Sequence, residues 1–344
     1  MAAALTAGFA SSVVPPAASN GQEIAIDGKA QRGRLRFATS GGPVHALSTF
    51  CHDHGVVVAH EPIGTGTDDQ AEAELSVAPA LLGRIDWRRR VLTGDALFCQ
   101  RDLCRQVQAA GGDYVLPVKE NQPTLHADLH LLFDPPANVE TGHGRSRERR
   151  ELVASTDLTV YLDWPGLQQV FRLERTWREH GQEKRACHYG ITSLAPDRAD
   201  PARLLALKRG HGTIENRLHR RKDVSFGEDA SLIHAGQGPT VLALLRDAAV
   251  SVLHRAGISQ VAARLRRHSQ FPAEAVALVI ESLPTGAEAL NRGVWRVDTA
   301  AYDFSILDRE DGEILVYHSH SGGACSQFRR ATCIFQPLMS SLEP

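Results

Sequence analysis

The chain has 344 residues, which is enough for one large domain with attachments or for two domains. Its 38 Lys and Arg residues nearly balance 40 Asp and Glu residues, so the charge gives no overall attraction for a polyanion. The six cysteines form no Cys-x-x-Cys pair, which argues against a structural zinc site and favours a reducing compartment, the cytoplasm. No apolar run reaches the ~18–20 residues needed to cross a membrane, so we expect no membrane partner.

Residues 1–20 are rich in Ala, Ser and Pro and lack the basic start of a signal peptide, which predicts a disordered leader. The first strand is predicted at 23–29, where an apolar run ends in Asp27 followed by glycine. An Asp-Gly pair is a common hairpin turn, and the alternative is a carboxylate that projects from a strand end into a cleft. Residues 44–50 and 55–59 are rich in β-formers and predict two strands that continue the sheet antiparallel.

The next segment predicts a parallel crossover. Residues 90–97 resemble a buried strand that ends in Asp95, and a second strand is predicted at 113–119. Helices are predicted at 70–82, 99–110 and 123–132. Because a strand, a helix and a strand follow one another, the two strands should be parallel, and acids at their carboxyl ends lie where open α/β sheets bind ligands.

Between about residues 135 and 200 the pattern becomes rich in strands. Strand-like runs occur at 158–161, 169–175 and 187–192. An arginine-rich run at 145–150 would suit a surface that faces DNA, although a solvated basic face is the commoner cause of such a run. We therefore expect a β-rich insertion in this part of the chain.

Residues 203–229 are predicted to hold a helix with one polar stripe. The stripe is His211, Glu215, His219 and Lys222, at i, i+4, i+8 and i+11. Ile214 and Leu218 lie opposite and could seat the helix on a core. Glycines at 210 and 212 cost about 1 kcal/mol each relative to Ala within a helix, so we expect the helix to fray there or to begin at Thr213.

A second helix is predicted from the apolar spacing between residues 241 and 253, and it should close the core. From about residue 285 the chain shifts to short strand-like runs that carry no recognisable chemistry. We treat residues 285–344 as an unassigned C-terminal segment.

Three acids distant in sequence could converge on one site, namely Asp27, Asp95 and Glu215. Convergent carboxylates repel one another unless a cation neutralises them. Hard oxygen ligands with open positions suit Mg²⁺ or Mn²⁺, and two such ions could serve phosphoryl transfer. The alternative is three unrelated acids, and periodicity alone slightly favours that alternative.

Four blocks carry a resemblance to a known family. They are 26–29 (Ile-Asp-Gly-Lys), 93–100 with its Thr-Gly-Asp-Ala, 112–124, and 214–229 with Ile-Glu-Asn and Asp-Val-Ser-Phe-Gly-Glu-Asp. With these blocks, in this order from about residue 23 to about 257, the chain resembles bacterial insertion-sequence transposases of the DDE type. The branch is the one called H-repeat-associated.

The resemblance implies an α/β, ribonuclease H-like catalytic domain over residues 21–284, with a mixed sheet flanked by helices. The β-rich insertion, about 135–200, would precede the third acid. It also implies that Asp27, Asp95 and Glu215 bind two Mg²⁺ or Mn²⁺ ions. The implied reaction is cleavage at transposon ends followed by attack of the freed 3′-hydroxyl on target DNA, by a possible homodimer on paired ends.

Candidate DNA contacts lie near these blocks and in the basic run of the insertion. They are Lys119, Asn121, His219, Lys222, Arg147 and Arg149. Positive charges there would clamp phosphates during phosphoryl transfer.

The chain departs from the family pattern before the first acid, where about twenty low-complexity residues stand in place of an N-terminal helical region. Two other functions stay open at this level. One is a catalytically inactive, DNA-binding remnant of a transposase, and the other is a metal-dependent phosphoesterase.

Overall fold

The computed structural model describes residues 21–31, 44–63, 70–133, 149–180, 182–233, 236 and 238–281, together with four strands between 294 and 330. Contacts group the chain into a large unit that includes Thr6–Val261 and a small unit that includes Ala262–Pro344. This division lies earlier than the boundary expected after residue 284. The leader at 1–20 lies outside the described residues, and the domain limits stay a prediction.

The large unit is built on one eight-stranded sheet of order β3-β2-β1-β4-β5-β8-β7-β6. Its strands are β1 (Gln22–Gln31), β2 (Val44–Cys51), β3 (Val56–Ile63), β4 (Arg90–Thr93), β5 (Asp113–Val118), β6 (Arg149–Ser155), β7 (Gln169–Glu179) and β8 (Gln182–Thr192). Strands β1 to β3 pair antiparallel, whereas β4 is parallel to both β1 and β5. This mixed arrangement confirms the predicted ribonuclease H-like fold class.

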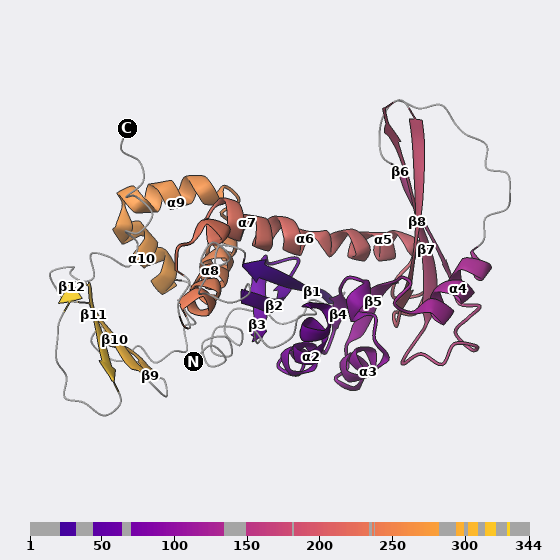
Figure 1. Cartoon of the computed structure of the whole chain (residues 1–344), viewed down its shortest axis with the longest axis horizontal. Helices are drawn as coiled ribbons and strands as arrows, with labels where there is room; N and C mark the ends of the chain where they lie inside the picture. Colours follow the sequence, from indigo (N-terminus) through magenta and orange to yellow (C-terminus); the bar gives the residue numbers. More distant parts are fainter. Residues whose placement is uncertain are drawn as a thin grey trace. The chain divides into compact units, whose positions relative to one another are not determined.

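Helices cover both faces of this sheet (Figure 1). On one face lie α2 (Gln70–Leu82), α3 (Arg101–Ala109) and α4 (Pro123–Leu132), and on the other α5 (Pro201–Gly210), α6 (Gly212–Ile214), α7 (Arg220–Val224) and α8 (Gly238–Arg255). The predicted helices at 70–82 and 123–132 have these bounds in the structure, and the predicted amphipathic helix after 240 is α8.

The central strand β1 shows why both faces need a cover. Ile24 and Ile26 are fully buried in the core under α2 and α3. Ala25 points to the other face, where it packs with Ile214 and Leu218 of the helical segment. Alternating side chains of one strand therefore join two cores, and a strand buried on both faces carries a continuous apolar run.

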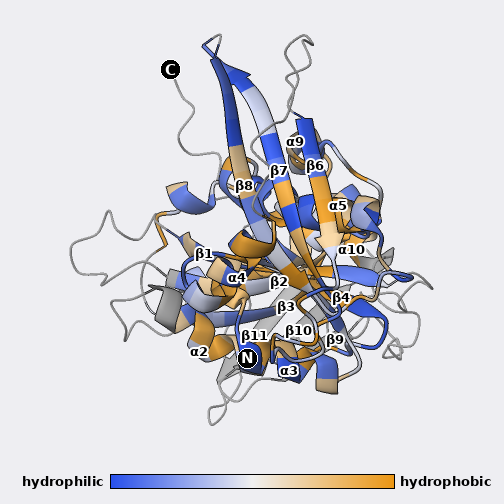
Figure 2. Ribbon diagram, turned by 90° about the vertical axis from the view of Figure 1, so that its right-hand side faces the viewer, coloured by the Kyte–Doolittle hydropathy of each residue, from blue (hydrophilic) through white to orange (hydrophobic). Residues whose placement is uncertain are grey.

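The strand-rich insertion extends the same sheet, because β8 pairs antiparallel with β5 and then with β7. The outer ends of β7 and β8 are hydrophilic and exposed (Figure 2). The predicted strand at 158–161 is wrong, since this run forms turns in which the Tyr161 N–H donates to the Leu158 carbonyl at 3.1 Å. Val160 is 97% exposed, so its β-branched side chain has no sheet face to cover.

The small unit contains most of α9 (Val261–Gln270), α10 (Pro272–Glu281) and a second sheet of order β12-β11-β10-β9. Its strands are β9 (Val294–Asp298), β10 (Tyr302–Asp308), β11 (Ile314–His320) and β12 (Arg329–Arg330). Among the described residues of the whole chain, no helix is long and apolar enough to span a membrane.

Candidate active site

Asp27 lies inside β1 and not at its end. The strand continues through Gln31, and Asp27 is in register with Ser48 of β2. Both local interpretations of the Asp-Gly pair, a hairpin turn and a strand end, are therefore wrong. Gly28 serves close packing, because a Cβ at this position would collide with the Glu74 carboxylate of α2. The Gly28 N–H donates to Asp27 Oδ1 at 3.0 Å and helps to orient the carboxylate.

Glu215 and His219 stand at the two ends of a π-helical turn, Glu215–His219, which joins α6 to α7. Ile214 and Leu218 are 1% and 0% exposed and pack on Phe50 and Val57 of the sheet, as expected for the apolar stripe. A π turn holds one residue more than an α-turn, and such turns are frequent at functional sites. Packing of its apolar residues sets the turn directly over β1.

The two glycines flank a break in this helical segment, since α5 ends at Gly210 and α6 begins at Gly212. The segment begins where the side chain of Asp200 accepts from the Arg203 N–H, and it runs to Val224 with interruptions at His211 and at the π turn. At Gly210 a Cβ would lie 2.5 Å from His52 Nδ1 and 2.6 Å from Glu23 Oε2. The break at His211 agrees with the expected fraying, and α6 begins at Gly212, one residue before the alternative start at Thr213. Glycine at 210 also allows the helix to approach the sheet closely.

The three side chains meet over β1 in a cluster that we call the acidic group (Asp27, Glu215 and His219). One ligand atom of each residue lies within 4.8 Å of those of the other two. His219 Nε2 is 3.2 Å from Asp27 Oδ2. His219 is buried, Asp27 is partly buried and Glu215 is exposed, so the group is open on one side.

Asp95 lies beyond β4, the strand next to β1, and outside the acidic group. Its Oδ1 accepts from the Leu97 N–H at 2.9 Å and caps a short 3₁₀ turn, η2 (Ala96–Phe98). Although the residue reaches solvent, partial burial of its carboxylate raises the pKa, and repulsion from Asp27 acts in the same direction. Ligand atoms of two predicted carboxylates, Asp27 and Glu215, thus lie within 4.8 Å of each other, and the charge of Asp27 acts on the third, Asp95.

The family comparison covers this whole arrangement. Residues 22–253 match the model of the Transposase DDE domain, which includes Asp27, Asp95 and Glu215. The chain belongs to the transposase DDE domain family. The predicted resemblance to insertion-sequence transposases is thereby confirmed.

Curated relatives carry matching descriptions. "Putative transposase YncI" of Escherichia coli O157:H7 is 29% identical over 254 residues, covering 68% of this chain and 62% of the relative. "H repeat-associated putative transposase YhhI" of Escherichia coli K12 is 29% identical over 248 residues, covering 67% of this chain and 63% of the relative. The chain thus spans less than two thirds of the length of these relatives.

A solved structure, the cryo-EM piggyBac transposase synaptic complex with hairpin DNA, aligns at a TM-score of 0.44 and 11% identity. The alignment covers 80% of this chain and 59% of that chain. A likeness this weak adds nothing to the fold described above.

The residues of this transposase-family site fit a divalent cation. Two carboxylates face each other with a third nearby, and such a set is stable when a cation lies among it. Both ring nitrogens of the buried His219 lack a hydrogen bond within the described part of the chain. Oxygen donors with one open side match the ligands that Mg²⁺ and Mn²⁺ use.

Lys222 is not at the site. It is 2% exposed, and its Nζ lies 2.8 Å from Asp247 Oδ1 and 3.4 Å from Glu228 Oε1. His60 Nδ1 is 2.7 Å from Asp247 Oδ2, which completes a cluster that we call the buried network (His60, Lys222, Glu228 and Asp247). The predicted phosphate contact by Lys222 is corrected, because a buried and paired ammonium cannot reach DNA. The π turn breaks the regular spacing on which the predicted stripe relied.

Of the remaining predicted DNA contacts, those within the described residues lie in two places apart from His219. Lys119 and Asn121 line a shallow depression together with Asp95, and Asn121 Nδ2 also donates to the Ala96 carbonyl at 2.6 Å. Arg149 is exposed at the start of β6, 3.1 Å from Glu151. Arg147 lies outside the described residues. Lys119 is therefore the predicted cation placed beside a predicted catalytic acid.

Sequence reasoning missed Lys208 of α5. Burial and the charge of Lys119 lower its pKa, whereas Asp95 opposes that shift, which places the ammonium among these groups. Burial and Lys208 likewise lower the pKa of His211 to about 4. Lys208 lies one helical turn before Gly212 in the sequence. Only the packing of α5 against the sheet brings it near Asp95, which follows β4 and is more than a hundred residues away.

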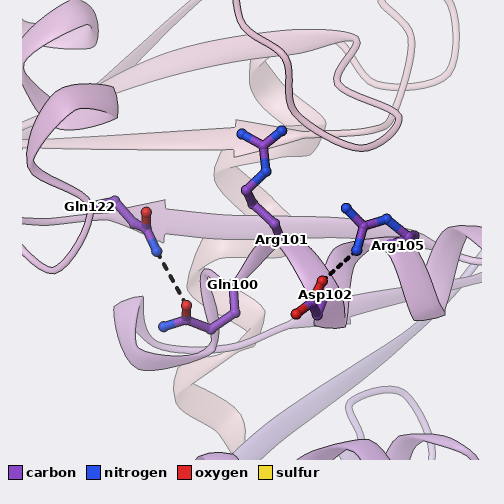
Figure 3. A pocket seen from close by; sticks show the side chains of 5 residues that line it. All are labelled: Gln100, Arg101, Asp102, Arg105 and Gln122. Carbon is purple, nitrogen blue, oxygen red and sulfur yellow. Dashed lines mark hydrogen bonds and ion pairs between the residues drawn. The ribbon is translucent and has the colours of Figure 1, made fainter.

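A separate hollow lies at the start of α3 (Figure 3). It is lined by Gln100, Arg101, Asp102, Arg105 and Gln122. Arg101 pairs with Asp163 and Arg105 with Asp102, so both guanidinium groups already have acidic partners. This hollow does not combine the carboxylates that the acidic group offers.

Proposed function

We propose that this protein is a DNA transposase that cleaves DNA at transposon ends and joins the freed 3′-hydroxyl to target DNA. In this proposal Asp27, Asp95 and Glu215 hold two divalent metal ions. The observation that carries it is the convergence of Asp27, Glu215 and His219 within 4.8 Å over the central strand of a transposase-family domain.

Bound Mg²⁺ or Mn²⁺ would activate the attacking oxygen and neutralise charge on the leaving oxygen. Asp27 projects from β1, which pairs with β2 on one side and with β4 on the other, so the carboxylate is held on a rigid element. Glu215 is exposed at the open side of the acidic group, where a DNA phosphate can approach. Lys119 and Lys208 place positive charge beside Asp95, where it would stabilise negative charge on phosphoryl oxygens.

DNA would bind as transposon ends and as target, and a homodimer on paired ends belongs to the same proposal. The exposed Arg149 and the hydrophilic ends of β7 and β8 would lie along the flanking backbone. Such contacts carry affinity and no sequence preference by themselves.

The test is nicking of DNA that carries the flanking inverted repeats, in Mg²⁺ or Mn²⁺. Asp95→Asn should lower the cleavage rate by about 100-fold or more, because the neutral amide loses the charge that holds the ion. The matched control is Asp102→Asn, an exposed acid of α3 that should leave cleavage unchanged.

Equal cleavage by Asp95→Asn would remove this residue from the site. DNA binding without cleavage by the natural protein would identify an inactive remnant. Hydrolysis of a chromogenic phosphodiester without any action on DNA would identify a phosphoesterase.

A further inference from the structure

We propose that His219 is itself a metal ligand, which makes the ion position at Asp27 and Glu215 a mixed oxygen and nitrogen site that prefers Mn²⁺ to Mg²⁺. This inference rests on the proposed function and specifies the metal chemistry of the same site. It changes the role of His219 from a candidate phosphate contact to a member of the metal centre.

The geometry of the acidic group suits one shared ion. On an octahedral ion with ligand distances of about 2.1 Å, neighbouring ligand atoms lie about 3 Å apart and opposite ones about 4 Å apart. His219 Nε2 and Asp27 Oδ2 are 3.2 Å apart, and the Glu215 ligand atom is within 4.8 Å of both. Small side-chain movements would therefore bring all three atoms onto one cation.

Within the described residues the His219 ring contacts Asp27 of the same group, with Nε2 3.2 Å from Asp27 Oδ2, but makes no hydrogen bond. It is 3% exposed, and neither Nδ1 nor Nε2 makes a hydrogen bond there. Two other buried histidines each have an acidic partner, since His60 Nδ1 is 2.7 Å from Asp247 Oδ2 and His52 Nδ1 is 2.7 Å from Glu23 Oε2. A buried polar ring without a hydrogen bond is costly, so an ion that accepts its lone pair accounts for its placement.

A proton shared between His219 and Asp27 is the competing explanation. It would join two of the three atoms and leave Glu215 outside, whereas a cation can bind all three. The approach of Nε2 to Asp27 also lacks the geometry of a hydrogen bond, although the two atoms are only 3.2 Å apart. The arrangement favours the cation.

The nitrogen donor sets the metal preference. Mg²⁺ prefers oxygen ligands. Mn²⁺ also uses oxygen ligands and is the weakest nitrogen binder of the first-row series, but as a member of that series it accepts an imidazole nitrogen more readily than Mg²⁺ does. Asp95 lies outside this group, so the two ion positions would differ in their ligands. Removing the imidazole should weaken Mn²⁺ binding far more than Mg²⁺ binding.

The experiment measures metal binding to the purified full chain, without DNA. Pulsed electron paramagnetic resonance of bound Mn²⁺ should show coupling to an imidazole ¹⁴N nucleus. His219→Asn should abolish that coupling and weaken Mn²⁺ binding in calorimetry by about tenfold or more, with a change of less than about twofold for Mg²⁺. The matched control, His254→Asn in α8, where His254 Nδ1 is 2.7 Å from the Gly55 carbonyl oxygen, should keep both the coupling and the affinity.

Bound Mn²⁺ without nitrogen coupling in the natural protein would overturn the inference and leave the proposed function intact. So would a His219→Asn variant that keeps the coupling. A different outcome would contradict the proposed site itself, namely an Asp27→Asn variant that binds Mn²⁺ as tightly as the natural protein does. If His219→Asn does not fold, His219→Gln and the spectrum of the natural protein, compared with that of the His254→Asn control, decide the question.

Discussion

The acidic group and the buried network both combine carboxylates with a histidine, but they differ in burial and in whether a lysine lies among the carboxylates. Both use residues of the helical segment that runs from α5 to α7, where His219 and Lys222 are three positions apart. In the buried network an ammonium lies between two carboxylates. In the acidic group two carboxylates and one imidazole meet at an open side, and His219 Nε2 lies 3.2 Å from Asp27 Oδ2. The buried network is closed to solvent with its cation inside, whereas the acidic group stays open to a cation from outside.

The ionisation of the buried network follows from this pairing. Burial opposes the charge on Asp247, but Lys222 and His60 outweigh burial and hold its pKa well below the ordinary value. Burial likewise opposes the charge on Lys222, and its two acidic neighbours raise its pKa nevertheless. Asp247 and Lys222 therefore stay charged at neutral pH, whereas burial raises the pKa of Glu228.

The largest effect should come from Lys222→Met, which breaks the buried network. Asp247 would lose its buried ammonium, and Glu228 would keep only Arg246 and Lys29, at 3.6 and 4.0 Å. The free energy of unfolding should therefore fall by about 3–5 kcal/mol in urea titrations. Lys119→Met, at an exposed lysine, should change it by about 0.5 kcal/mol or less. A stable Lys222→Met protein with weakened DNA binding would restore the original role of Lys222 as a phosphate contact.

One substitution type should have opposite effects in the two clusters. Asp247→Asn should lower the free energy of unfolding by about 3 kcal/mol, because Lys222 loses a buried partner. Asp27→Asn, measured with a chelator present, should raise it by about 0.5–1 kcal/mol, because repulsion with Asp95 is relieved. Loss of stability in both variants would show that Asp27 has a structural role and would end the contrast.

His211 should make the site end of the helical segment sensitive to acid. Its pKa is lowered to about 4 in the folded protein, while an unfolded chain titrates near 6.5, so the unfolded state binds more protons between these values. Stability should therefore fall by about 1–3 kcal/mol as pH decreases from about 6.5 to about 4. Thermal unfolding across this range, compared with His211→Asn, checks the effect, and an unchanged pH dependence in the variant would refute it.

The smallest effect should be on DNA affinity through Lys119, an exposed residue that carries positive charge beside the site. Lys119→Ala should weaken DNA binding at all sequences and reduce the salt slope of the affinity by about one. Fluorescence anisotropy at several salt concentrations measures both quantities. A slope equal to that of the natural protein would remove Lys119 from the DNA surface.

Local patterns were sufficient for much of the framework. Helices α2 and α4 have the bounds that composition and an initial proline predicted. The succession of β4, α3 and β5 follows from two buried apolar runs joined by a helical segment long enough for a parallel crossover. The pattern failed at 158–161, because β-forming residues become a strand only where another strand can pair with them.

The sequence by itself determined which acids the chain carries and, through motif resemblance, which three of them are candidates for one metal site. Only the tertiary structure decided that Asp27 lies within a strand, that Gly210 allows close packing, and that His219 faces the acids while Lys222 turns away. The physical reason is that each of these outcomes depends on a partner distant along the chain. Lys222 finds its partner at Asp247, and His219 meets Asp27, through packing that no local spacing contains.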